Sequence, residues 1–187
     1  MNKKNISTIK NFLEVLNGKK LQSFIRSGSM GDLGFGDYIE KNIRGFNDEK
    51  KLISKIVYVP QYVLHIDCHF RLSCGDEIIL SRGDIFQPSN VLYSDSNFDY
   101  EAFDWDISDN NRFDEISKKM FHNQNSTFIV SKIIISKFGD IKIHFENGFL
   151  LDICPDISGN EECWRFFEQL SDEHLIVSGN GIVEEDN

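Results

Sequence analysis

Apolar and polar side chains alternate through residues 64–71, which read Leu-His-Ile-Asp-Cys-His-Phe-Arg. A repeat of two residues is typical of a β-strand with one buried and one exposed face. The pattern therefore predicts a strand over 62–72. A second strand-like segment follows at 77–81, after the turn residues Ser73-Cys74-Gly75-Asp76. We expect these two strands to form an antiparallel hairpin.

The last third of the chain repeats this organisation. Strand-like segments at 128–136, 141–146 and 149–154 are separated by Lys-Phe-Gly-Asp and Asn-Gly, which are turn sequences. Short turns connect antiparallel neighbours, so these segments predict a meander. Residues 175–177 and 182–183, around Gly-Asn-Gly, predict a final hairpin or bent strand.

Helical spacing of apolar residues occurs in three places. It predicts helices over 6–17, 110–121 and 160–170, and the last of these follows the capping box Ser158-Gly-Asn-Glu161. A short strand is expected at 21–26. The glycine-rich segment 27–36 lacks the Gly-Lys-Ser/Thr of a phosphate-binding loop, so it predicts a strand interrupted by turns or bulges. Residues 40–52 are polar and predict a surface connection.

These elements predict an α+β fold in which a mostly antiparallel sheet, built of hairpins and a meander, packs against two to three helices. The 187 residues and 16 Phe suffice for the core of a single domain, 1–187, with a loose acidic end at 184–187. No apolar run reaches the roughly 20 residues of a transmembrane helix, and the lysines at positions 3 and 4 precede no apolar segment. We therefore expect a cytoplasmic protein with no membrane partner.

Charge restricts the class of partner. The net charge of −10 argues against nucleic acid and favours either plain solubility or a basic protein partner. Residues 1–60 carry eleven Lys or Arg and six Asp or Glu, whereas residues 61–187 carry nine and twenty-four. The four cysteines, Cys68, Cys74, Cys154 and Cys163, lack Cys-x-x-Cys spacing, so we expect reduced thiols and no cofactor.

The polar face of the 64–71 pattern is a weak candidate for a catalytic site, comprising His65, Asp67, His69 and Arg71. On one strand His65 and His69 would lie about 13 Å apart, too far to share a metal ion without help from His144 or His174. Asp67 could orient either imidazole as a base, but the motif has no nucleophile. The alternative is a solvated sheet face on which Asp67 and Arg71 form an ion pair.

A second candidate is the acidic aromatic segment of residues 94–109, which contains no Lys or Arg. It is either a long loop or an edge strand, and its candidate binding residues are Asp99, Tyr100, Glu101, Phe103, Asp104, Trp105 and Asp106. Aromatic anchors surrounded by charges are common in protein interfaces. The segment does not have the residue series of an EF-hand calcium loop. The alternative is a solvated loop whose aromatic side chains fold into the core.

Several landmarks occur in a recognisable order: Leu64-His-Ile-Asp-Cys-His-Phe-Arg71, Gly83-Asp-Ile-Phe-Gln-Pro88, Trp164-Arg-Phe-Phe167 and His174-Leu-Ile-Val177. This order resembles a family of small uncharacterised bacterial proteins, over most of residues 20–183. Phe70 stands where that family has Trp. Small proteins of this kind often accompany toxins as immunity proteins, so the resemblance implies that role without assigning an activity.

The sequence thus favours a protein-binding module and, more specifically, an immunity protein that inhibits a toxin by occlusion. A small hydrolase or metal-dependent enzyme that uses His65, Asp67 and His69 is the alternative. A structural subunit without activity is a third possibility. The oligomeric state is not indicated.

Overall fold

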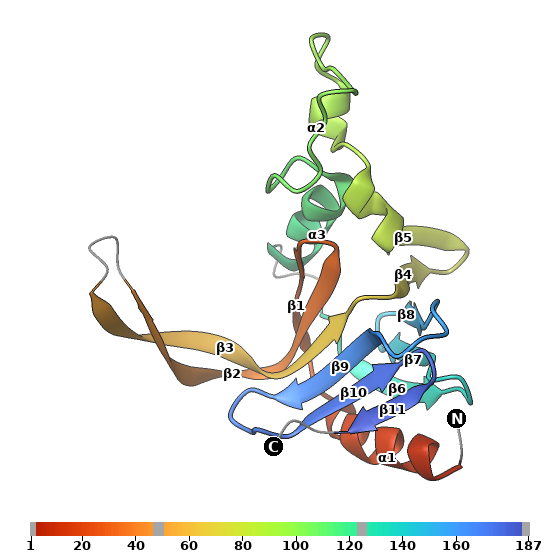
Figure 1. Ribbon diagram of the computed structural model, residues 1–187. Coiled ribbons are helices and arrows are strands. Elements are labelled where there is room, and N and C mark those ends of the chain that lie inside the picture. Colours follow the sequence, from red (N-terminus) through yellow and green to blue (C-terminus); the bar gives the residue numbers. More distant parts are fainter. Residues whose placement is uncertain (1–2, 47–50, 123–126, 185–187) are drawn as a thin grey trace.

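The computed structural model describes residues 3–46, 51–122 and 127–184 and contains two antiparallel sheets (Figure 1). The larger sheet has the order β1 (Leu21–Ser27), β2 (Met30–Phe46), β3 (Leu52–Ile66), β9 (Glu162–Glu168), β10 (His174–Ser178) and β11 (Gly181–Glu184). The smaller sheet has the order β5 (Glu77–Ser81), β4 (His69–Cys74), β8 (Phe149–Cys154), β7 (Ile141–Phe145) and β6 (Val130–Ile135). The predicted α+β fold, with its β4–β5 hairpin, β6–β8 meander and β10–β11 hairpin, is confirmed.

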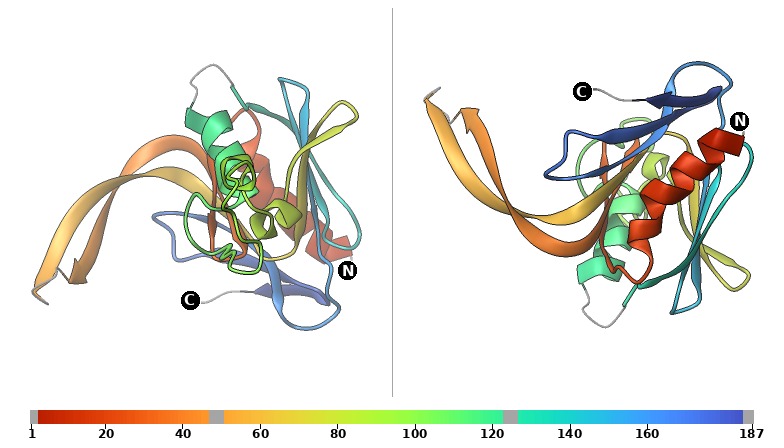
Figure 2. Two further views of the ribbon diagram at one scale, coloured as in Figure 1. Left: turned by 90° about the horizontal axis from the view of Figure 1, so that it is seen from above. Right: turned by 90° about the horizontal axis from the view of Figure 1, so that it is seen from below.

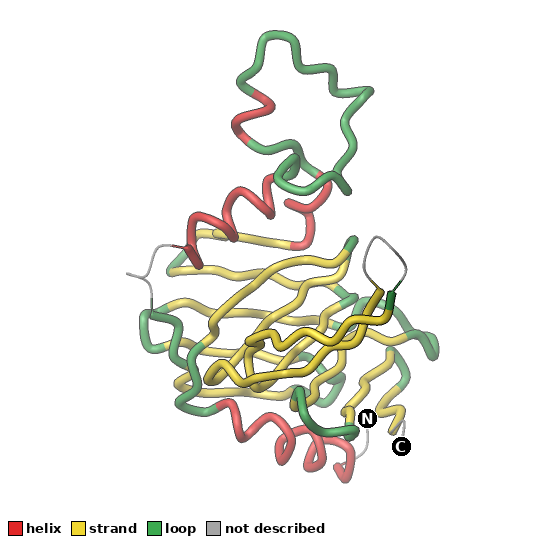
Figure 3. Tube along the Cα trace, turned by 90° about the vertical axis from the view of Figure 1, so that its left-hand side faces the viewer, coloured by secondary structure: helices red, strands yellow, loops and turns green. Residues whose placement is uncertain are grey.

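Helices cover the two ends of these sheets (Figures 1 and 3). The structure has α1 (Lys3–Leu13), which continues as the short 3-10 helix η1 (Glu14–Leu16), then η2 (Arg82–Phe86), α2 (Asn90–Tyr93) and α3 (Arg112–His122). The predicted helices at 6–17 and 110–121 are confirmed. None of the helices in the described residues is long and apolar enough to span a membrane. The predicted tail lies mostly outside the described residues, because β11 ends at Glu184.

Both sheets and both long helices contribute to one apolar core. Phe24 of β1 contacts Phe70 of β4 and Phe113 of α3, with ring centroids 5.2 and 5.3 Å apart. Trp164 of β9 is fully buried, and its indole Nε1 donates a hydrogen bond of 3.1 Å to the carbonyl of Gly139, in the β6–β7 turn. The core therefore joins the two sheets directly.

The predicted strand at 62–72 is in fact two strands in different sheets, so this prediction is wrong. β3 ends at Ile66, opposite Trp164 of β9, and β4 begins at His69, opposite Cys154 of β8. The Asp67 backbone N–H bonds to the carbonyl of Cys163, 2.8 Å away, where the chain passes between the sheets. The alternation of buried and exposed residues continues across the break, which explains why sequence alone predicts one strand.

The predicted helix at 160–170 is also wrong, because residues 162–168 form strand β9. Trp164 and Phe166 lie opposite Ile66 and Leu64 of β3, and all four side chains are buried. Aromatic residues favour strands, and pairing with β3 on one side and β10 on the other satisfies the backbone of β9. The residues of the expected capping box precede this strand and start no helix.

Residues 40–52 were expected to form a surface connection, but most of them belong to a long two-stranded arm. The arm consists of Tyr38–Phe46 of β2 and Leu52–Pro60 of β3, and it projects from the larger sheet (Figures 1 and 2). It begins at a bulge between Phe35 and Tyr38, where Gly36 has a φ of +82°. The expectation of bulges and turns in the glycine-rich segment is therefore confirmed.

Candidate functional site

The acidic aromatic segment lies in a loop, residues 87–111, that projects from the end of the body (Figures 1 and 3). Its two ends are held together. The Ser89 N–H donates to the Asn110 carbonyl at 2.7 Å, and the Arg112 N–H donates to the Gln87 carbonyl at 2.8 Å. Between these ends only the short helix α2 interrupts the irregular backbone. Of the two alternatives from the sequence, the long loop is observed.

Three acidic side chains shape the loop backbone. Asp95, Asp99 and Asp104 each accept a hydrogen bond at 2.9–3.0 Å from the backbone N–H two residues later. Such turns suit Asp because its short carboxylate reaches its own downstream backbone. The outer carboxylate oxygens still face solvent, since all three residues are exposed. These residues therefore combine a structural role with negative surface charge.

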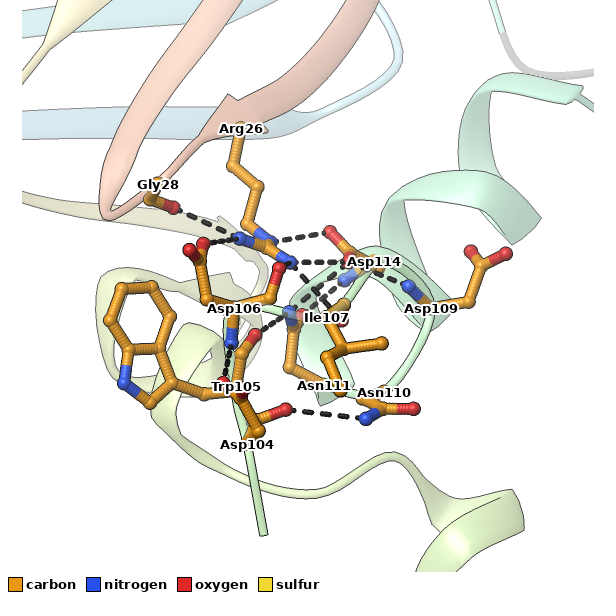
Figure 4. Close-up of polar contacts among 10 residues, drawn as sticks. All are labelled: Arg26, Gly28, Asp104, Trp105, Asp106, Ile107, Asp109, Asn110, Asn111 and Asp114. Carbon is orange, nitrogen blue, oxygen red and sulfur yellow. Dashed lines mark hydrogen bonds and ion pairs between the residues drawn. The ribbon is translucent and has the colours of Figure 1, made fainter.

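Arg26 of β1 anchors the loop to the body (Figure 4). Its Nε and Nη2 atoms contact both carboxylate oxygens of Asp114 at 2.9 and 3.0 Å, and Nη1 lies 3.2 Å from Asp106 Oδ1. The same guanidinium donates to the carbonyls of Gly28, Asp106 and Ile107. Burial by itself would lower the pKa of Arg26, but these two carboxylates outweigh it and raise that pKa. Arg26 thus remains a cation at neutral pH.

Asn111 closes the other side of the anchor. Its side chain is buried, and Oδ1 accepts a hydrogen bond of 2.8 Å from the Asp114 N–H, which caps the first turn of α3. Its Nδ2 donates to the Trp105 carbonyl at 2.9 Å and to Asp114 at 3.1 Å. One amide therefore fixes both the helix and the loop that precedes it.

The aromatic side chains of the loop divide into two groups. Trp105 is partly buried against the core and packs on Phe86, with ring centroids 5.1 Å apart. Phe103 is partly buried within a small cluster that contains Phe98 and Tyr100. Tyr100 remains 55% exposed. Of the three predicted anchors, only Tyr100 is available as an exposed side chain.

Two exposed residues of α2 extend the surface of Tyr100 and were missed by sequence reasoning. Val91 and Tyr93 are 75% and 71% exposed, and Tyr93 contacts Phe98 with a ring distance of 6.5 Å. Their signal in the sequence is weak, because an apolar residue in a four-residue helix looks like a core position. Arg26 was missed as well, since it lies 80 residues before its partner Asp106.

The acidic residues differ in whether a cation neutralises them. Asp106 pairs with Arg26, and Asp109 lies 3.1 Å from the Nζ of Lys118. Within the part of the chain that the structure describes, no Lys or Arg forms an ion pair with four carboxylates, those of Asp95, Asp99, Glu101 and Asp104. The uncompensated charge therefore lies in the outer part of the loop, around the aromatic cluster. We call residues 91–104 the acidic aromatic surface.

A groove runs beside the base of the loop. It has a volume of about 660 Å³ and lies between β1, the base of the arm and α3. Ile25 and Tyr38 supply exposed apolar surface, while Asp106 and Asp109 line the side formed by the loop. The cation partners of these two acids, Arg26 and Lys118, line the same groove, so the groove adds apolar contact area but no unpaired negative charge.

The four weak catalytic candidates are not brought together in one site. His65 Nε2 lies 3.6 Å from Asp32 Oδ2 in the larger sheet, whereas Arg71 bonds to Asp152 at 3.1 Å in the smaller one. Asp67, between the sheets, lies 3.5 Å from Arg82, so the expected Asp67–Arg71 pair is not observed. His69 is exposed at the start of β4. None of the four lines the groove.

Other reactive groups are also separate or buried. The described residues contain no cluster of three or more His, Cys, Asp or Glu that could hold a metal ion. The four cysteines are free thiols, and Cys68 and Cys163 are buried. Burial raises the pKa of both thiols, and nearby acidic groups raise it further. Cys68 therefore serves as a small apolar residue, as its place in the alternation predicted.

Comparisons of the chain with protein-family models, with curated proteins and with solved structures give no match. The resemblance to small uncharacterised bacterial proteins therefore remains a prediction from the sequence landmarks.

Proposed function

We propose that this chain is a cytoplasmic protein-binding module whose acidic aromatic surface occludes a basic protein, as an immunity protein neutralises a toxin. One observation carries the proposal. Four carboxylates without a cation partner among the described residues surround exposed Tyr93 and Tyr100 on a loop that projects from the body. Exposed aromatic side chains supply contact area, and surrounding charges of one sign accelerate association with a partner of the opposite sign.

The loop is anchored in a way that suits binding. Arg26 and Asn111 hold its base with hydrogen bonds and ion pairs. Asp turns and the cluster of Phe98, Tyr100 and Phe103 constrain its outer part. An ordered surface reduces the entropic cost of association. The adjacent groove supplies further apolar area at Ile25 and Tyr38.

A capture experiment tests the proposal. The immobilised protein is exposed to extract of the source cells, beside a loop variant with Asp95→Asn, Asp99→Asn and Glu101→Gln. Asn retains a side-chain oxygen that can accept the turn hydrogen bonds, so this variant removes charge without removing the turns. The matched control neutralises three exposed acids of the smaller sheet, with Asp76→Asn, Glu77→Gln and Glu146→Gln.

We expect a basic protein that wild type and control retain and that the loop variant loses. Tyr100→Ala should weaken the same complex by about 2 kcal/mol, the size of an interface hot spot. Equal losses in loop variant and control would mean that net charge alone attracts the protein. Equal retention by both variants would place the binding surface elsewhere on the molecule.

A further inference from the structure

The two-stranded arm is a second surface that the proposed function does not use. In the described residues its strands pair only with each other, because pairing of β1 with β2 ends at Phe35 and pairing of β3 with β9 begins at Tyr62. Two-stranded ribbons without a covering layer are marginally stable in water. An arm of this kind is therefore expected to gain a cover in solution.

One face of the arm carries large exposed apolar side chains. Residues directly opposite each other in an antiparallel pair lie on the same face, and so do alternate residues of one strand. Tyr38 lies opposite Pro60, and Tyr58 and Ile56 are the next alternate residues of β3, so these four side chains share one face. Ile56, Tyr58 and Leu52 are 59%, 66% and 65% exposed. Because Tyr38 also lines the groove, this face continues outward from the groove along the arm. Contiguous exposed apolar surface of this kind marks interaction sites.

The charge of the whole arm selects its occupant. Its residues 38–46 and 52–60 contain three Lys or Arg and one Glu, a net charge of +2. Arg44 and Glu40 lie on the same face as Ile56, and Lys41 and Lys55 lie on the other face. Two arms would therefore repel each other. The acidic aromatic surface, residues 91–104, contains four Asp or Glu and no Lys or Arg, a net charge of −4. The acidic aromatic surface thus complements the arm in sign, and its Val91, Tyr93 and Tyr100 offer apolar contacts.

We propose that the arm binds the acidic aromatic surface of a second copy of this chain, in a reciprocal dimer. The arm and the loop project from different sides of the same body (Figures 1 and 2). A two-fold axis relates the two copies, so the arm of each copy lies along the loop of the other. Both contacts form at once, which closes the dimer and leaves neither surface uncovered.

This inference goes beyond the proposed function, since dimerisation is measured on the purified chain alone. The two share the acidic aromatic surface, so the arm and a basic partner compete for it. A captured partner without a dimer contradicts only the inference, and a dimer without a captured partner contradicts only the proposed function.

Sedimentation velocity on the full chain tests the dimer. At about 50 mM NaCl wild type should sediment at twice the monomer mass of 21.6 kDa, and about 500 mM NaCl should shift it toward monomer because salt screens the charges. The arm variant Arg44→Glu with Ile56→Glu should be monomeric. The loop variant Asp99→Asn with Glu101→Lys should be monomeric too, whereas Asp76→Asn with Glu77→Lys, which changes the charge equally on the β4–β5 turn, should remain dimeric.

Mixing the two monomeric variants gives the decisive result. The intact arm of the loop variant can bind the intact loop of the arm variant, so the mixture should recover dimers through one contact. Circular dichroism spectra equal to wild type confirm that the variants fold. The inference is overturned by a wild type that stays monomeric up to about 100 µM. It is equally overturned if either variant remains dimeric alone, or if the mixture remains monomeric.

Discussion

The body and the projecting loop are stabilised by different forces. The body buries Phe24, Phe70 and Trp164 in a core shared by both sheets, and burial of apolar area dominates its stability. In the loop no residue from Asn90 to Asn110 is buried, and directional hydrogen bonds and ion pairs hold the backbone. The comparison shows how a folded chain can carry concentrated negative charge: the charged segment is attached to the core but contributes little to it.

The largest effect is expected from the body. Trp164→Ala removes a fully buried indole that links the two sheets, and we expect a loss of about 3–5 kcal/mol in the free energy of unfolding. Urea denaturation followed by circular dichroism measures this loss. Trp164→Phe, which keeps most of the volume and gives up the hydrogen bond to Gly139, should cost less. An Ala variant as stable as wild type would contradict the shared core.

The next effect should be confined to the loop. Arg26→Met keeps an apolar chain of similar length but leaves Asp114 without its bidentate partner. We expect a cost of about 2 kcal/mol in the free energy of unfolding, which is less than for a fully buried ion pair because Asp106 is solvent-exposed. Hydrogen exchange should accelerate at least about tenfold in residues 95–111 and remain unchanged in β7 and β8. Faster exchange throughout the body would erase the distinction between the two regions.

Removal of the buried cap should have a smaller effect. Asn111→Ala deletes the acceptor for the Asp114 N–H and the donor to the Trp105 carbonyl, at an expected cost of about 1–2 kcal/mol. Thermal unfolding measures it. Asn110→Ala is the neighbouring control, because its single side-chain hydrogen bond, to the Asp104 carbonyl, is exposed. A larger loss from Asn110→Ala than from Asn111→Ala would contradict the assigned cap.

The smallest effect concerns pH. The hydrogen bond from Lys119 lowers the pKa of Glu115 below its ordinary value of 4.5, and the Asn90 N–H acts in the same direction while burial opposes both. A lowered pKa stabilises the fold above the unfolded value, and this contribution disappears as pH falls through the folded pKa. Thermal unfolding from pH 7 to pH 3 should therefore reveal a difference between wild type and Glu115→Gln that is present above pH 4.5 and shrinks as the pH falls below that value. A difference that grows on acidification would contradict the sign.

Much of the fold was predictable because short-range signals control it. The turns at 137–140 and 147–148 define the meander, and the helical spacing of Phe113, Ile116 and Met120 defines α3. The chain break at Asp67 was not predictable, because alternation of buried and exposed residues continues across it. The secondary structure of residues 162–168 was also not predictable from the local pattern. Their helical spacing was overridden by pairing with β3, which is distant in sequence.

The candidate site was predictable only in part. Its composition identified the acidic aromatic segment, and the long loop was one of the two expected forms. Composition could not separate partly buried Trp105 from exposed Tyr100, because that difference depends on the contacts of Trp105 with Phe86 and Arg26. The arm was missed because the polar residues of 40–52 are typical of connections as well as of ribbons with exposed faces.

The central claim is that the acidic aromatic surface contacts another protein, and site-specific photocross-linking tests it most directly. A benzophenone amino acid replaces Tyr100 in one variant and Ile78, a slightly more exposed residue of the smaller sheet, in another. On irradiation in the source cells, position 100 should form a covalent adduct with a basic protein, in addition to any adduct with a second copy of the chain. Position 78 should not form it. The same adducts from both positions, or none from position 100, would contradict the claim.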